Sequence, residues 1–152
     1  MGRSAGELVV LHRTKSQPCG SMNIDNPHSA LRNTIISFQD AFNAGDLSTV
    51  VLTFEHNGIV MPNNGPAAQG HPSIQALYQS LFNTFAITMS YTIEEQVMAG
   101  EYAFVRTSSQ VLTHIRASGE TISLLNKELF VLRREADQWK ISQYIFNNTA
   151  KN

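Results

Sequence analysis

The chain has 152 residues, of which 42% are hydrophobic and 15% are charged, and its formal net charge is -1 at pH 7. This length fits one domain whose core can fold without metal ions or disulfide bonds. The near-neutral charge argues against a nucleic-acid-binding surface, which needs clustered basic residues. The single cysteine, Cys19, excludes an internal disulfide and a zinc site built from several thiolates. The sequence has no apolar run of the roughly 20 residues that a membrane helix needs and no secretion signal, so we expect a cytoplasmic protein that binds neither nucleic acid nor membrane.

Residues 1–24 show no sustained hydrophobic period and mix glycine, serine and scattered charges. We interpret them as a loosely ordered N-terminal extension, within which Met22 is a candidate native start. Residues 25–152 are interpreted as a single domain.

Three helices are predicted in the first half of this domain. Asn26 is expected to cap the first helix, which begins at the proline after it and stops at Gly45. Asp46 then caps a short second helix over 47–54. An amphipathic third helix over 70–85 follows a strand that proline and glycine interrupt.

From residue 87 the hydrophobic pattern changes from a helical period to the alternation of β-strands. It continues to residue 149 as four strands, with short connections at Gly100, at 117–120 and at 135–138. Helices followed by consecutive long strands are typical of an α+β protein, in which helices cover an antiparallel sheet.

One of these strands, 126–135, carries Lys127 and Glu128 side by side. Side chains on a strand point to alternate faces, so one of these ionisable groups faces inward unless the start of the strand lies beyond the core. If Glu128 faces inward, so do Asn126 and Phe130, and together they would form a pocket wall that runs from polar to apolar.

The preceding strand is predicted to present Phe104, Arg106, Ser108 and Gln110 on one face by the same alternation. Arg106 and Glu128 then become candidates for a pair across the pocket. In such a buried pair each charge stabilises the ionised form of the other. An ion pair that only ties the strands together, with no ligand, explains these two residues equally well.

The order of the elements, with the segments "AFNAGDLSTVVLTF", "MPNNGP" and "GHPSIQALYQSLF", resembles the SnoaL-like group of proteins. This group belongs to the nuclear-transport-factor-2-like superfamily, which includes ketosteroid isomerase, and the resemblance covers residues 28–149. It implies a cone-shaped α+β barrel, in which a curved and mostly antiparallel sheet wraps over three N-terminal helices and encloses one apolar pocket. It also implies a homodimer formed through the outer face of the sheet.

The residues that ketosteroid isomerase uses are only partly matched. Its tyrosine falls on Phe38, and its base falls on Met61 or Pro62, neither of which can take a proton. Tyr78 matches the supporting tyrosine, and the protonated carboxylic acid falls on or beside Glu128. Steroid-type enolisation is therefore not expected.

A mostly apolar cavity with a few polar groups is typical of a small-molecule site, so we expect a small apolar or amphipathic ligand. Glu128 as acid or base, with Arg106 as its positioner, would suit a hydrolase of the epoxide or ester type, and a protonated Glu128 would suit an isomerase. The alternative is a non-catalytic ligand-binding or dimerisation module. The five histidines show no metal-like spacing, so no metal and no cofactor are expected. The candidate ligand-binding residues are Asn126, Gln110, Ser108, Tyr78, Tyr144, Phe146, Phe38, Met61 and Phe130.

Overall fold

The computed structural model describes residues 27–150. The predicted extension over 1–24 and the predicted Asn26 cap lie outside this range. The helices are α2 (Pro27–Ala44), α3 (Leu47–Leu52) and α4 (His71–Thr84). The strands are β1 (Phe54–Met61), β2 (Ala68–Gln69), β3 (Phe85–Ala99), β4 (Tyr102–Ile115), β5 (Thr121–Glu135) and β6 (Gln138–Ala150).

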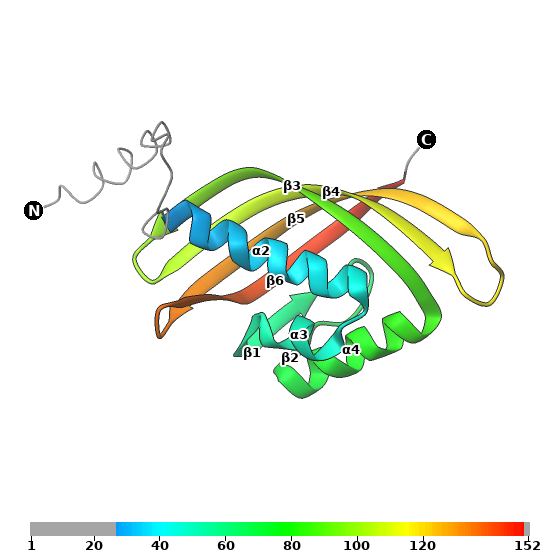
Figure 1. Cartoon of the computed structure of the whole chain (residues 1–152), viewed down its shortest axis with the longest axis horizontal. Coiled ribbons are helices and arrows are strands. Elements are labelled where there is room, and N and C mark those ends of the chain that lie inside the picture. Colours follow the sequence, from blue (N-terminus) through cyan, green and yellow to red (C-terminus); the bar gives the residue numbers. More distant parts are fainter. Residues whose placement is uncertain (1–26, 151–152) are drawn as a thin grey trace, which may run out of the picture.

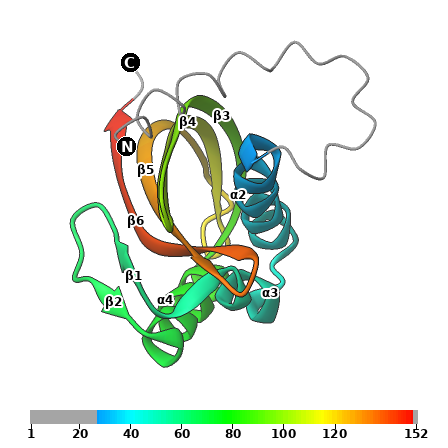
Figure 2. The same ribbon diagram turned by 90° about the vertical axis from the view of Figure 1, so that its left-hand side faces the viewer.

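The strands form one curved sheet in the order β2-β1-β6-β5-β4-β3. Only β1 and β6 run parallel, and every other neighbouring pair is antiparallel. The long strands arch over α2, while α3 and α4 lie beside β1 and β2 (Figures 1 and 2). The predicted α+β class and curved sheet over three helices are confirmed. The sheet remains open, with β2 and β3 at its edges, so it curves like a barrel without closing.

The connections predicted from glycine and polar residues are confirmed. Gly100 and Gly119, with φ of +66° and +78°, occupy the left-handed region in the turns on either side of β4. The last turn instead places Ala136 and Asp137 in that region. Asp46 caps α3 as predicted, because its Oδ1 accepts a hydrogen bond from the Thr49 N–H at 3.3 Å.

The core lies between α2 and the inner face of the sheet. Leu31, Ile35, Phe38 and Phe42 recur at helical spacing along α2 and are all buried. Phe38 is the centre of an aromatic cluster, with its ring centroid 5.4 Å from that of Tyr144 and edge-on to it. Such edge-to-face contacts stabilise the core beyond the burial of apolar area.

Two side chains of α2 cap the edge of β3. The Asn43 Nδ2 donates to the Met89 carbonyl at 2.8 Å, and the Met89 N–H donates back to Asn43 Oδ1 at 2.8 Å. The Tyr91 N–H donates to Gln39 Oε1 at 2.9 Å. Unpaired groups at a sheet edge invite pairing with another chain. Here the helix supplies the hydrogen bonds that a further strand would otherwise make.

None of the helices between residues 27 and 150 combines the length and apolar character that crossing a membrane requires.

Candidate functional site

Glu128 is buried on the inner face of β5, with 3% of its surface exposed, and Lys127 is exposed on the outer face. The inward orientation predicted for Glu128 is therefore confirmed. The Thr107 hydroxyl donates to Glu128 Oε1 at 2.6 Å, and the Ser109 hydroxyl donates to Oε2 at 2.5 Å.

Burial raises the pKa of Glu128 above the usual 4.5, although the hydrogen bonds from Ser109 and Thr107 and a smaller contribution from Asn126 lower it. Among the described residues, no arginine, lysine or histidine forms an ion pair with it. The site is therefore a buried carboxyl group that neutral donors hold.

The predicted pairing of Arg106 with Glu128 is wrong. Arg106 lies on the outer face of β4, where its Nε is 3.2 Å from Glu95 Oε1 and its side chain is 53% exposed. The register places Thr107, and not Arg106, opposite Glu128. The prediction chose the wrong face of β4 because both faces carry apolar residues, so that alternation alone did not decide between them.

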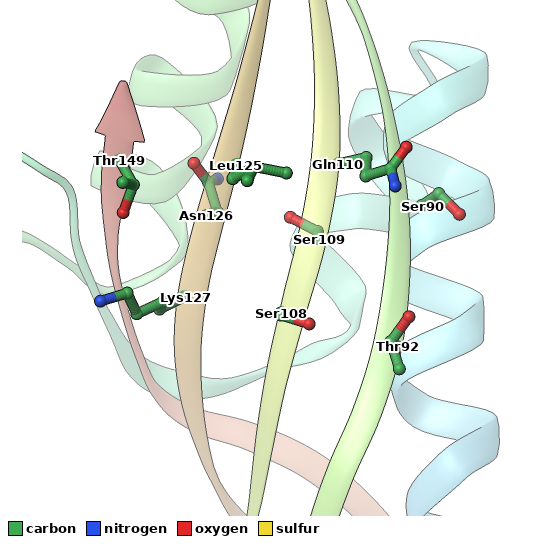
Figure 3. A pocket seen from close by; sticks show the side chains of 9 residues that line it. All are labelled: Ser90, Thr92, Ser108, Ser109, Gln110, Leu125, Asn126, Lys127 and Thr149. Carbon is green, nitrogen blue, oxygen red and sulfur yellow. The ribbon is translucent and has the colours of Figure 1, made fainter. Parts of the chain in front are cut away.

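The same error moves Ser108 and Gln110 out of the predicted pocket. Both lie on the outer face of the sheet and line a pocket to which β3, β4, β5 and β6 all contribute (Figure 3). The Ser108 hydroxyl donates to Glu94 Oε2 at 2.8 Å on this face. The inner face of β4 instead carries Ala103, Val105, Thr107, Ser109 and Val111, which are all buried.

Two cross-strand rows of side chains make the inner face polar at its middle. One row runs through Tyr91, Ser109, Asn126 and Asn148 on four neighbouring strands. Within it the Asn148 Nδ2 donates to Asn126 Oδ1 at 2.7 Å. In the next row, Glu128 lies between Thr107 and Phe146.

Tyr91, which is half-buried, and Tyr144, which is buried, meet beside these polar side chains. The hydroxyl oxygens of Tyr91 and Tyr144 are 2.6 Å apart. Burial holds the pKa of both well above the usual 10, and the nearby Glu128 carboxyl raises them further. Both phenols are therefore neutral at physiological pH.

A cavity of about 430 Å³ lies between the helices and the inner face of the sheet. On the helix side it is lined by Phe38, Phe42, Tyr78 and Leu81. On the sheet side it is lined by Ile87, Met89, Val111, Leu124, Tyr144 and Phe146. Its polar side chains include Asn126 and Asn148 of the sheet and Asn63 from the β1–β2 connection. An apolar chamber with a polar end is the usual form of a small-molecule site.

The structure brings five of the predicted ligand-binding residues together around this cavity: Phe38, Tyr78, Asn126, Tyr144 and Phe146. Met61 and Phe130 are not among the lining residues, which corrects their prediction. Phe130 is fully buried because its ring stacks on Tyr144, with centroids 4.3 Å apart. Glu128 does not line the cavity either, and lies directly beyond Asn126 and Phe146.

Thr107, Ser109, Tyr91 and Asn148 were missed by sequence reasoning. A usable signal was present, since a hairpin turn fixes the register of its strands. Ile115 donates its N–H to the Glu120 carbonyl at the β4–β5 turn. Counting equal numbers of residues outward from that pair places Thr107 opposite Glu128.

The described residues contain no cluster of side chains suited to binding a metal ion. No group of three or more histidine, cysteine, aspartate or glutamate side chains gathers anywhere in residues 27–150. The His56 and His71 rings lie 5.6 Å apart, and His71 Nε2 is 2.9 Å from the Phe54 carbonyl oxygen. Two imidazoles without a third ligand do not make up a zinc site.

The family model of the SnoaL-like domain matches residues 35–142, which is more than half of the chain. The chain belongs to the SnoaL-like family. No curated protein sequence matches this SnoaL-like protein.

Solved structures resemble this SnoaL-like protein over most of its length. A ketosteroid isomerase-like protein from Erwinia carotovora atroseptica is 29% identical, with a TM-score of 0.77, over 81% of this chain and 96% of that one. A candidate dehydratase of the NTF2-like family from Streptomyces avermitilis is 16% identical, with a TM-score of 0.74, over 84% and 99%. An NTF2-like protein with a cystatin-like fold from Novosphingobium aromaticivorans is 17% identical, with a TM-score of 0.65, over 82% of each chain. The last two likenesses concern the fold alone.

Proposed function

We propose that this SnoaL-like protein binds a small, largely apolar molecule in the interior cavity, with the polar group of the ligand directed at Asn126 and Asn148. The observation that carries the proposal is the cavity of about 430 Å³, whose aromatic and aliphatic wall ends in these two amides. This volume lies within the range of small-molecule sites. Tyr78 also lines the cavity, and burial raises its pKa, so its phenol is neutral.

A second candidate function is a cofactor-free proton transfer, as in an isomerase or a dehydratase. The raised pKa of Glu128 favours it, because a general acid or base works best when its pKa is near the operating pH. A substrate atom would have to reach Glu128 between Asn126 and Phe146, which line the cavity on either side of it. The Erwinia relative, described as ketosteroid isomerase-like, also favours this class. The hydrolase alternative is weaker, because Arg106 lies on the other face of the sheet and is not placed to position the carboxylate.

We also propose a homodimer through the outer face of the sheet. Leu125, Leu129 and Ile145 are exposed there, and Leu129 and Ile145 are direct neighbours across β5 and β6. The same face carries the cations Arg106 and Lys127 and the carboxylates of Glu94 and Glu95, so a second copy can meet it with opposite charges.

The cavity proposal is tested with two neutral two-ring probes, 2-naphthol and 2-acetylnaphthalene. Both are expected to bind the wild type, and Leu124→Trp, which fills the cavity from β5, should weaken binding about tenfold or more. Ser123→Trp adds the same bulk to the exposed, opposite face of the strand and should leave affinity unchanged. Binding is followed by titration calorimetry.

If neither probe binds the wild type, or if both tryptophan variants bind as the wild type does, the cavity is not the ligand site. Turnover of an enone by the wild type that is lost in Glu128→Gln, with probe affinity kept, would separate the proton-transfer candidate from binding alone.

A further inference from the structure

Two asparagines of the sequence are followed directly by glycine. Asn57 precedes Gly58 within β1, and Asn64 precedes Gly65 in the connection between β1 and β2. An asparagine can lose its side-chain amide when the backbone nitrogen of the next residue attacks its side-chain carbonyl carbon. A glycine at that place favours the attack, because it has no Cβ to shield its nitrogen and leaves the backbone free to turn. The two sites share this chemistry and differ in their surroundings.

Asn64 and Gly65 lie in the open loop between β1 and β2, which projects from the molecule in Figure 2. Both residues are exposed, and within residues 27–150 neither the Asn64 side chain nor the Gly65 N–H has a hydrogen-bond partner. A Cβ built on Gly65 would find its nearest neighbour 3.7 Å away, at the Pro62 ring. The peptide between the two residues is therefore free to rotate until the Gly65 nitrogen meets the side chain.

Asn57 is equally exposed, but the glycine after it is held by the sheet. Gly58 is buried, and its carbonyl oxygen accepts a hydrogen bond from the Gly70 N–H at 2.9 Å. A Cβ built on Gly58 would lie 3.1 Å from both the Ile141 carbonyl oxygen and the Phe54 side chain. Since β1 lies between β2 and β6, the peptide between Asn57 and Gly58 can rotate only if the strand leaves the sheet.

We propose that Asn64 is a site of spontaneous deamidation and that the fold protects Asn57 from the same reaction. The Gly65 nitrogen forms a bond to the Asn64 Cγ, and the bond from Cγ to Nδ2 breaks. The departing nitrogen takes up the proton of the Gly65 amide and leaves as ammonia. One water molecule then opens the five-membered imide at either of its two carbonyl carbons, which gives aspartate or isoaspartate. The reaction consumes only water.

The modified residue directly follows Asn63, which lines the interior cavity. Both products replace the neutral amide of Asn64 with a carboxylate. Isoaspartate also lengthens the backbone by one methylene group, because the chain then runs through the side-chain carboxyl. The reaction therefore alters the segment that supplies one of the polar side chains of the cavity.

The proposal is tested by ageing the folded wild-type chain in mildly alkaline buffer, which favours the attack because the amide nitrogen loses its proton more readily. Chemical cleavage at Met61, which lies between the two sites, separates them for mass spectrometry, and tandem fragmentation assigns each change to a residue. We expect Asn64 to gain the mass difference between a hydroxyl and an amino group and to give two products, while Asn57 stays unchanged. In urea, where the sheet is lost, both sites should react at similar rates.

An unchanged Asn64 in the folded chain, or equal rates at both sites there, would overturn the proposal. Asn57 remaining inert in urea as well would show that the fold is not what protects it.

Gly65→Ala tests the attacking atom. The added methyl group has room, and Gly65 is not among the glycines of positive φ, so the variant should fold. It should slow the loss of the Asn64 amide about tenfold or more, because the methyl group shields the nitrogen and restricts the backbone. Asn57 staying intact in this variant reports that the sheet is preserved. Loss of the Asn64 amide at the wild-type rate would refute attack by the Gly65 nitrogen.

Discussion

Glu128 shows how a buried acid can be accommodated without a counter-ion. Removing an ionised carboxyl group from water is costly, and the hydrogen bonds from Thr107 and Ser109 offset part of that cost. The balance remains unfavourable to the charged form, since the pKa is raised. The contribution of Glu128 to the free energy of unfolding therefore depends on pH.

This cost gives a prediction for stability. Because the pKa of Glu128 is raised on folding, the folded state binds more protons than the unfolded state between 4.5 and that raised pKa. The wild type should therefore lose stability relative to Glu128→Gln as the pH rises through this window, and the difference should level off above it. Urea unfolding of both proteins at a series of pH values measures this. A difference between the two that does not change with pH would show that Glu128 titrates alike in the folded and unfolded chains.

The face chosen for β4 is where sequence reasoning failed at single residues. Phe104 and Leu112 favoured burial of one face of β4, and Val105 and Val111 favoured burial of the other face equally. Burial of the face with Phe104 would also bury Arg106, and burying a charge is costly. This cost indicates that the face with Val105 is the inner one, which places Thr107 and Ser109 beside Glu128.

At the scale of elements, the helices, the strands and their connections were predictable because hydrophobic period and turn chemistry are local. The capping of β3 by α2 was not, because it depends on how a helix docks against a strand far along the chain. Asn43 has no local feature that distinguishes it from Asn33 in the same helix. Only the tertiary structure shows that Asn43 holds Met89 through both of its amide atoms.

Asn43→Ala should accordingly lower the free energy of unfolding by about 1–3 kcal/mol, because two backbone groups of Met89 lose their partner. Asn33→Ala is the matched control, since Asn33 is exposed in the same helix and the residue change is the same. Urea denaturation of the two variants provides the comparison. Equal stability of both variants would mean that water replaces the Asn43 amide without cost.

At the scale of the molecule, the fold class and the family followed from the order of elements, whereas the shape of the cavity did not. Cavity shape depends on packing between α2, α4 and the sheet, and periodicity carries no information about it. For the same reason the sequence could propose Met61 and Phe130 as lining residues although the structure places them elsewhere.

The proposed dimer is tested at this scale. One chain has a mass of 16.8 kDa, so the wild type should scatter light as a particle of twice that mass. Ile145→Glu, which adds a charge to the exposed apolar patch of the outer face, should give single chains. Leu52→Glu, at a position that is 59% exposed on α3, should remain dimeric. Wild-type protein at the single-chain mass would refute the dimer.

The helix side of the cavity and the polar groups around Glu128 come from different parts of the chain. The hydrogen-bonded groups around Glu128 all belong to the strands from β3 onward, whereas Phe38, Phe42, Tyr78 and Leu81 belong to the helices. Substitutions in the helices can therefore change the shape of the cavity while Glu128 and its hydrogen-bond partners stay unchanged. The shape of the cavity can thus vary through the first half of the chain while the polar groups in the second half stay the same.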